Sequence, residues 1–219
     1  SAATATLSEQ RTVDLATGEQ LLAAALVVDG SAPLRSALSD DTAPVESRRS
    51  IVKSVFGSYT PAAQAVLESL ASGRWSSEDD FVASIERLGI RAVASSAPKS
   101  VSVDDELFAF SNAVSSNAEL ELALGSKLGS SEGKVALVTK LLAGKASEQT
   151  VAILKALLAQ PRGRRIGELV RYASTIVAEA FGHTIATITV ATPLAADQTA
   201  RLEKALSARY GTTIRINEL

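Results

Sequence analysis

Two glycine–lysine pairs come nearest, in residue type and spacing, to a known chemistry, the binding of a nucleotide phosphate by a glycine-rich loop. The segment Gly129-Ser130-Ser131-Glu132-Gly133-Lys134 has one residue too few between its glycines, and Val135 stands where a hydroxyl would hold magnesium. Gly144-Lys145 has Thr139 where the first glycine belongs. Neither pair follows a predicted strand. Both are therefore interpreted as turns at helix ends.

The other groups that could act in catalysis or binding are few. His183 follows Glu179 by four residues, which would place both on one helix face, but there is no second ligand or nucleophile beside it. We interpret this single histidine as structural. Arg162, Arg164 and Arg165 form a small basic cluster, which we interpret as a solvated turn, with contact to an acidic partner as the alternative.

The composition excludes several classes of function. The 219 residues are 46% hydrophobic and 21% charged, carry a net charge of −2 and include no cysteine. The charge gives no basic surface for nucleic acid, and the missing cysteine excludes disulfides and thiolate metal sites. No apolar run reaches the roughly 20 residues of a membrane-spanning helix, so direct membrane insertion is not expected. We predict no catalytic residue, cofactor or metal site.

Internal repetition organises the first four fifths of the chain. Residues 21–38 align without a gap on residues 107–124, at an offset of 86, with seven identities in eighteen positions. Further on, the offset grows to 88, where Arg74 matches Arg162, Val82 matches Val170 and Ala92 matches Ala180. Repetition of this kind is typical of a duplicated structural unit. We predict two related copies.

Each copy is predicted to consist of consecutive helices. Phe81, Ile85, Leu88 and Ala92 recur at three- and four-residue steps, which indicates one apolar helix face. Proline- and glycine-containing segments at 29–33 and 57–61 separate further helices, and 95–100 is the predicted linker between copies. Trp75, in the turn before the acidic residues 78–80, is interpreted as a plug that caps a helix junction.

The pattern changes after Gly182. Residues 184–191 alternate and are rich in β-branched side chains, which predicts a strand, and a helix with Leu202 and Leu206 leads to a second strand around Ile214. Such a unit is too small to close a core alone. We predict a mainly α fold, with helical bundles at 1–97 and 98–183 and an incomplete α/β domain at 184–219.

An ordered series of segments over residues 103–219 resembles the delta subunit of the bacterial F-type ATP synthase. The series comprises the turn Pro161-Arg162-Gly163-Arg164-Arg165, the long helix that runs into a strand, Val190-Ala191-Thr192-Pro193-Leu194, Asp197-Gln198 at a helix start, and Tyr210-Gly211. The family normally has one six-helix bundle. The duplicated helices resemble the enlarged delta subunits of actinobacteria, some of which are fused to the b subunit.

The resemblance implies a mechanical function rather than an enzymatic one. A subunit of this kind ties the alpha subunits of the catalytic head to the b subunit of the peripheral stalk, at the cytoplasmic face of the plasma membrane, and resists rotor torque. The alternative, from the helical repeats alone, is an adaptor that binds amphipathic peptides in a regulatory complex. An enzyme that uses phosphate is disfavoured by the defective loops.

The resemblance also implies a docking groove for N-terminal helices of alpha subunits, between the first and fifth helices of the bundle. These are residues 81–96, a helix that both copies would share, and residues 147–160. Ala152, Ala156 and Ala159 form a stripe of small residues on the latter, while Ile90 and Val93 lie off the core stripe of the former. An amphipathic helix in such a groove is a common mode of recognition. We predict that these five residues bind the alpha helices.

Overall fold

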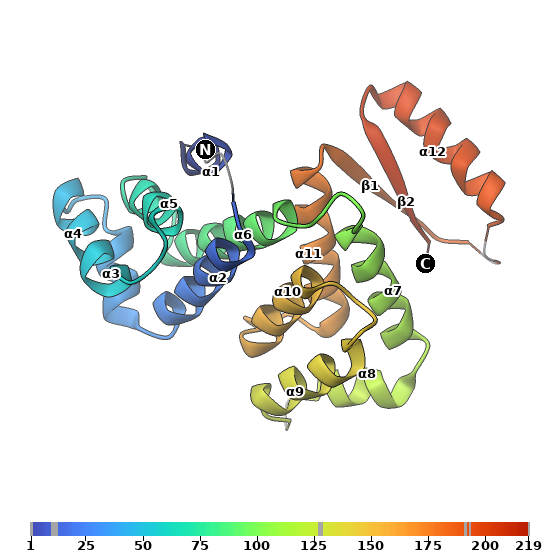
Figure 1. Ribbon diagram of the computed structural model, residues 1–219, viewed down its shortest axis with the longest axis horizontal. Coiled ribbons are helices and arrows are strands. Elements are labelled where there is room, and N and C mark those ends of the chain that lie inside the picture. The colour runs from blue at the N-terminus through green and yellow to red at the C-terminus, as the bar shows by residue number, and fades with distance from the viewer. Residues whose placement is uncertain (1, 10–12, 127–128, 191, 193, 219) are drawn as a thin grey trace.

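The computed structural model describes the whole chain except residues 1, 10–12, 127–128, 191, 193 and 219 (Figure 1). In this part it has twelve helices and two strands, which confirms the predicted mainly α class. The helices are α1 (Ala2–Glu9), α2 (Leu15–Asp29), α3 (Ala32–Ser39), α4 (Val45–Phe56), α5 (Pro61–Ala71), α6 (Glu78–Ser95), α7 (Val103–Ser115), α8 (Ala118–Gly125), α9 (Ser131–Leu142), α10 (Glu148–Ala159), α11 (Ile166–Ala180) and α12 (Ala196–Tyr210). The strands are β1 (His183–Ile188) and β2 (Thr213–Glu218).

Side-chain caps fix where several helices begin. Thr60, before Pro61, accepts a hydrogen bond from the backbone N–H of Ala63 at 3.3 Å, and Ser147 accepts one from Thr150 at 3.2 Å. Such caps satisfy backbone donors that the first turn leaves unpaired. Ser77 likewise accepts from the N–H of Asp80, at 3.1 Å. It starts α6 at Glu78, so the predicted start at residue 81 was late by three residues.

The order of helices repeats along the chain. Helices α3, α4, α5 and α6 begin at residues 32, 45, 61 and 78, and helices α8, α9, α10 and α11 begin at residues 118, 131, 148 and 166. The spacing between corresponding starts therefore grows from 86 to 88 residues, as the sequence alignment does. We call α2–α6 the first helix set and α7–α11 the second helix set.

The buried apolar residues form two clusters, and α6 contributes to both. Its first half supplies Phe81 and Ile85 to the cluster of the first helix set. Its second half supplies Ile90 and Val93 to the cluster of the second helix set. Figure 1 accordingly shows α6 running from one set into the other.

Helix α2 lies directly on α6, and two glycines permit the close approach. A Cβ atom on Gly18 of α2 would lie 2.6 Å from the backbone nitrogen of Val93 on α6. A Cβ atom on Gly89 of α6 would lie 2.9 Å from Cγ of Leu22 on α2. Each helix thus presents a glycine to the other. Helix α2 also contacts the second helix set, because its residue Leu22 belongs to the second cluster.

The C-terminal unit is a small parallel sheet with one crossover helix. Strands β1 and β2 pair in parallel, with His183 opposite Thr213 and Ile188 opposite Glu218, and α12 connects them. Arg215 of β2 binds Asp105 of α7, which ties this unit to the second helix set. In the described part of the chain, no single helix has the length and apolar character to cross a membrane, and the one pair that does, α2 with α3, is bent by 108°.

Candidate partner-binding cleft

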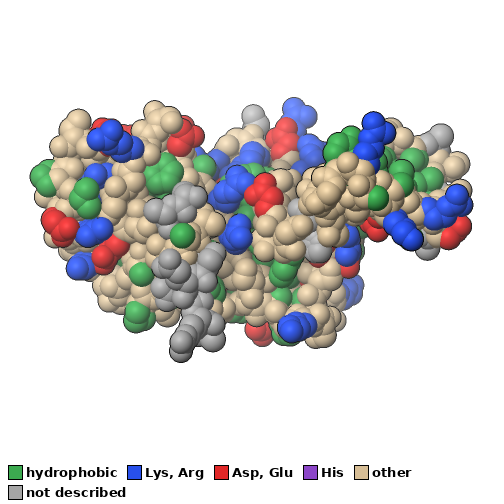
Figure 2. Space-filling view, turned by 90° about the horizontal axis from the view of Figure 1, so that it is seen from above, with side chains coloured by type: hydrophobic (Ala, Val, Ile, Leu, Met, Phe, Trp, Pro, Cys, Tyr) green, Lys and Arg blue, Asp and Glu red, His purple; other side chains and the backbone are tan. Residues whose placement is uncertain are grey.

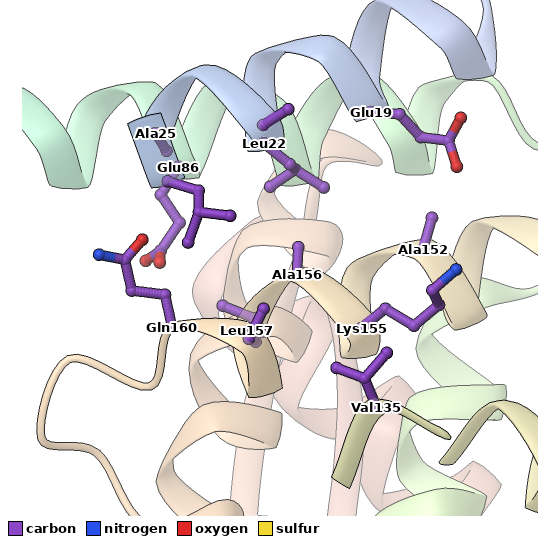
Figure 3. A pocket seen from close by; sticks show the side chains of 13 residues that line it. Glu19, Leu22, Ala25, Glu86, Val135, Ala152, Lys155, Ala156, Leu157 and Gln160 are labelled. Carbon is purple, nitrogen blue, oxygen red and sulfur yellow. The ribbon is translucent and has the colours of Figure 1, made fainter. Parts of the chain in front are cut away.

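An open, mainly apolar cleft of about 270 Å³ lies between α2 and α10 (Figure 3). Leu22 of α2 and Ala156 of α10 point toward each other across it. The helices α6 and α9 contribute one residue each to its walls. The lining residues are Glu19, Leu22, Ala23, Ala25, Leu26, Glu86, Val135, Ala152, Lys155, Ala156, Leu157, Ala159 and Gln160.

The α10 wall follows from helical spacing. Ala152, Ala156 and Ala159 are four and three residues apart, so they share one face of α10, and all three line the cleft. Ile153 and Leu154, which do not line the cleft, hold another side of α10 in the second cluster, and Leu157 contributes to both. The small alanine side chains leave the space that a larger residue would fill. The three alanines predicted from the sequence thus share one wall of the cleft, and their binding role stays a prediction.

The predicted α6 wall was wrong. Ile90 and Val93 are 0% exposed and pack in the core of the second cluster, so neither lines the cleft. The reason is the close packing of α2 on α6 through Gly18 and Gly89, which covers the face of α6 that the prediction left open. Helix α2 forms the second wall in its place.

The α2 residues of the cleft were missed in the sequence. Leu22 is buried, whereas Leu26 remains 43% exposed at the edge, beside Val27 with the same exposure. The signal that could have found this wall is the pair of glycines within α2 and α6. A glycine inside a helix costs about 1 kcal/mol relative to alanine, so it usually marks a close packing contact.

The charges around the cleft are mixed in sign. Glu19 and Lys155 are exposed on opposite walls, while Glu86 is buried and pairs with Arg164 at 2.7 Å. The wider surface has the same character: Figure 2 shows acidic and basic side chains interspersed over the face seen from above, in keeping with the net charge of −2. The cleft therefore favours a ligand with an apolar face and few charges.

The arginine cluster in the turn before α11 is not simply solvated. Arg162 lies between Asp29 and Asp79, at 3.7 and 3.4 Å, and its side chain is 16% exposed. Arg164 donates to both oxygens of Glu86, and its guanidinium stacks 4.2 Å from the ring centre of Tyr172. Arg162 and Arg164 thus pair with acidic residues of this same chain, whereas Arg165 is exposed.

The phenol of Tyr172, whose ring lies against the Arg164 guanidinium, has a raised pKa. Burial raises the pKa of its phenol to about 12, and the negative charge of Glu86 acts in the same direction. The positive charge of Arg164 opposes them. Removal from water disfavours the phenolate, because a charge is poorly solvated in the protein interior.

The remaining candidate groups do not assemble into a chemical site. Gly133 lies in the first turn of α9, where its N–H donates to Ser130 at 3.1 Å, and Gly144 lies in the turn before α10. Helix α11 ends at Ala180, so His183 begins β1 instead of sharing a helix face with Glu179; its side chain lies outside the described residues. Glu179 pairs with Arg87.

Trp75 acts as the predicted plug. Its indole N–H donates to the carbonyl of Leu70 at the end of α5, at 3.0 Å, and its ring packs edge-on against Phe81 at 5.5 Å. Within the described residues, no group of three or more histidine, aspartate or glutamate side chains could hold a metal ion.

The chain is similar in sequence to a family of known proteins over most of its length. The family described as ATP synthase delta (OSCP) subunit matches residues 90–218, beginning in the half of α6 that packs in the second cluster. An ATP synthase subunit delta of Leifsonia xyli subsp. xyli is 49% identical over 94% of this chain and 78% of its own length. Those of Kineococcus radiotolerans and Corynebacterium aurimucosum are each 35% identical, over 92% and 96% of this chain and 74% and 80% of their own lengths.

Proposed function

This chain belongs to the ATP synthase delta (OSCP) subunit family, and from that premise we propose that it is a non-catalytic subunit of the peripheral stalk. In this role it links alpha subunits of the catalytic head to the b subunit, at the cytoplasmic face of the plasma membrane, and resists the torque of the rotor. The peptide-binding adaptor considered from the repeats alone is set aside, because relatives along nearly the whole chain are named delta subunits.

The observation that carries the proposal is the shape of the α2–α10 cleft. Its α10 wall is a stripe of alanines, and its α2 wall ends in the exposed Leu26. An amphipathic helix can place its apolar face in such a groove while its polar face stays in water. We therefore assign the N-terminal helix of an alpha subunit to this cleft, between α2 and α10, in place of the position between α6 and α10.

The b subunit is assigned to the C-terminal unit. One face of α12 presents Leu202, Ala205 and Ala208 together with Arg201 and Lys204 around a surface hollow. An acidic amphipathic helix complements a surface of this kind. The two proposed contacts then lie on different parts of the chain, as a link between head and stalk requires.

The cleft assignment is tested by filling it. We expect Ala156→Trp to lower the affinity for a peptide from the alpha-subunit N-terminus by about tenfold or more, equal to about 1.4 kcal/mol, because the indole occupies the groove. Ala123→Trp, on an exposed position of α8 outside the cleft, is the matched control. Calorimetry measures the affinities, and circular dichroism checks that both variants stay folded. Full-strength binding by a folded Ala156→Trp variant contradicts the assignment.

A further inference from the structure

One short turn of the second helix set makes a cluster of polar contacts with the first. Gln160 and Arg162 both bind Asp29 of α2, Arg162 also binds Asp79 of α6, and Arg164 binds Glu86 of α6. We name these six residues the latch. We propose that the latch fixes the relative orientation of the two helix sets and so holds the α2–α10 cleft at a defined width.

The backbone of the turn is held in an unfavourable conformation. Arg162 has φ of 48°, and in the described part of the chain it is the one residue other than glycine with a positive φ. The left-handed region is disfavoured for a long side chain, so it persists only where surrounding contacts require it. Here the conformation coincides with the contacts from Arg162 to Asp29 and Asp79.

The main-chain carbonyl of Asp29 accepts a hydrogen bond from Arg35 of α3 at 2.7 Å, whereas its carboxylate is bound from the second helix set. Asp29 is the last residue of α2, where the helix dipole places partial negative charge and a carboxylate is unfavourable. Gln160 and Arg162 supply the donor and the positive charge that offset it. Glu86 has the same need, because its side chain is 8% exposed and a buried carboxylate requires a partner.

The duplication provides an internal comparison. The positions in the second helix set that correspond to the acidic residues Asp29, Asp79 and Glu86 hold the uncharged residues Ser115, Gly167 and Ser174, at the offsets of 86 and 88 found above. If these acidic residues formed ion pairs within their own copy, both copies would be expected to hold them. The first copy keeps Arg74 at the position of Arg162, but the acidic residues occur in the first copy alone, as expected if the ion pairs form between the two helix sets and not within each.

The latch and the cleft are adjacent. Glu86 and Gln160 line the cleft, so the latch forms one end of it. Asp29 and Arg162 are not lining residues. A change at either of these two positions therefore alters the orientation of the walls without removing a group that a bound helix would touch.

The orientation is measured as a distance between two spin labels. The chain has no cysteine, so Ser47→Cys on α4 and Ala136→Cys on α9 provide two exposed labelling sites, one in each helix set. We expect a narrow distance distribution in the parent chain. Asp29→Ser, which introduces the residue of the second copy, and Arg162→Ala should each broaden or shift it. The double variant should change the distribution by less than the sum of the two single changes, because both remove the Asp29–Arg162 contact.

Circular dichroism confirms folding, and if Arg162→Ala does not fold, the milder Asp29→Ser carries the test alone. A distribution unchanged in folded variants overturns the latch. The statement about cleft width rests on the proposed function and is tested by the affinity for the alpha-subunit peptide, which should fall by about tenfold in both variants. A broadened distribution with unchanged affinity overturns that statement alone. A parent chain that fails to bind the peptide overturns the proposed function, and the latch is then judged on the distances.

Discussion

Glu106 of α7 holds the start of α10 through Ser147. Its Oε2 atom accepts hydrogen bonds from both the backbone N–H and the hydroxyl of Ser147, at 3.0 and 2.6 Å. The same tie exists in the first helix set, where Oε1 of Gln20 on α2 accepts from the backbone N–H of Thr60 at 2.7 Å. Gln20 and Glu106 are 86 residues apart, and the capping residues Thr60 and Ser147 are 87 apart. The two copies thus share individual hydrogen bonds as well as the pattern of apolar residues.

Removing this tie should destabilise the second helix set. We expect Glu106→Ala to lower the free energy of unfolding by about 2 kcal/mol, because hydrogen bonds to a charged group contribute about 1.5–3 kcal/mol and the N-terminus of α10 loses its acceptor. Glu106→Gln, which copies the residue of the first helix set, should cost less than half as much. Urea denaturation measures both. Equal losses in the two variants would contradict this account.

The glycines between α2 and α6 should resist substitution. We expect Gly18→Ala to lower the free energy of unfolding by about 1–3 kcal/mol, because the added Cβ overlaps the backbone of Val93 and α2 must move outward. Gly89→Ala should cost less, since part of its overlap is with the Leu22 side chain, which can shift. The control is Gly125→Ala at the end of α8, where a Cβ meets nothing within 4 Å. A neutral Gly18→Ala would refute the close contact.

Tyr172 gives the protein a pH dependence at the alkaline end. Because burial raises its pKa from 10.0 to about 12, the folded state holds the phenol proton more tightly than the unfolded state. This contribution to stability is fully present below about pH 10 and is lost as the pH rises through about 12. The absorbance of tyrosinate, compared between the parent chain and Tyr172→Phe, reports the titration. A midpoint near pH 10 for Tyr172 would contradict the removal of its ring from water.

The glycine–lysine pairs should not bind nucleotide. Gly133 lies inside the first turn of α9 and donates to the Ser130 cap, so its N–H is already engaged. We expect no heat of binding from Mg-ATP in calorimetry. A micromolar dissociation constant that is lost in Lys134→Ala or Lys145→Ala would reverse this interpretation.

The sequence by itself determined the local structure and the repetition. Caps such as Thr60 and Ser147, breaks at proline and glycine, and apolar residues at helical spacing act over a few neighbours, so the predicted helices appear close to their expected bounds. The alternation of β-branched residues after Gly182 likewise predicted a strand, and β1 covers residues 183–188. The alanine stripe of α10 is a property of one helix, which is why it could be predicted.

Only the tertiary structure decided which faces remain open. The pattern of α6 alone placed Ile90 and Val93 on the surface, but both are buried in the second cluster. Val93 also lies against Gly18 of α2, a contact between segments about 70 residues apart. The partners of Arg162 and Arg164 likewise lie 78 to 133 residues earlier in the chain. The spacing of apolar residues within one helix does not predict how closely a second helix approaches it. Close packing sets that distance, and with it the second wall of the cleft.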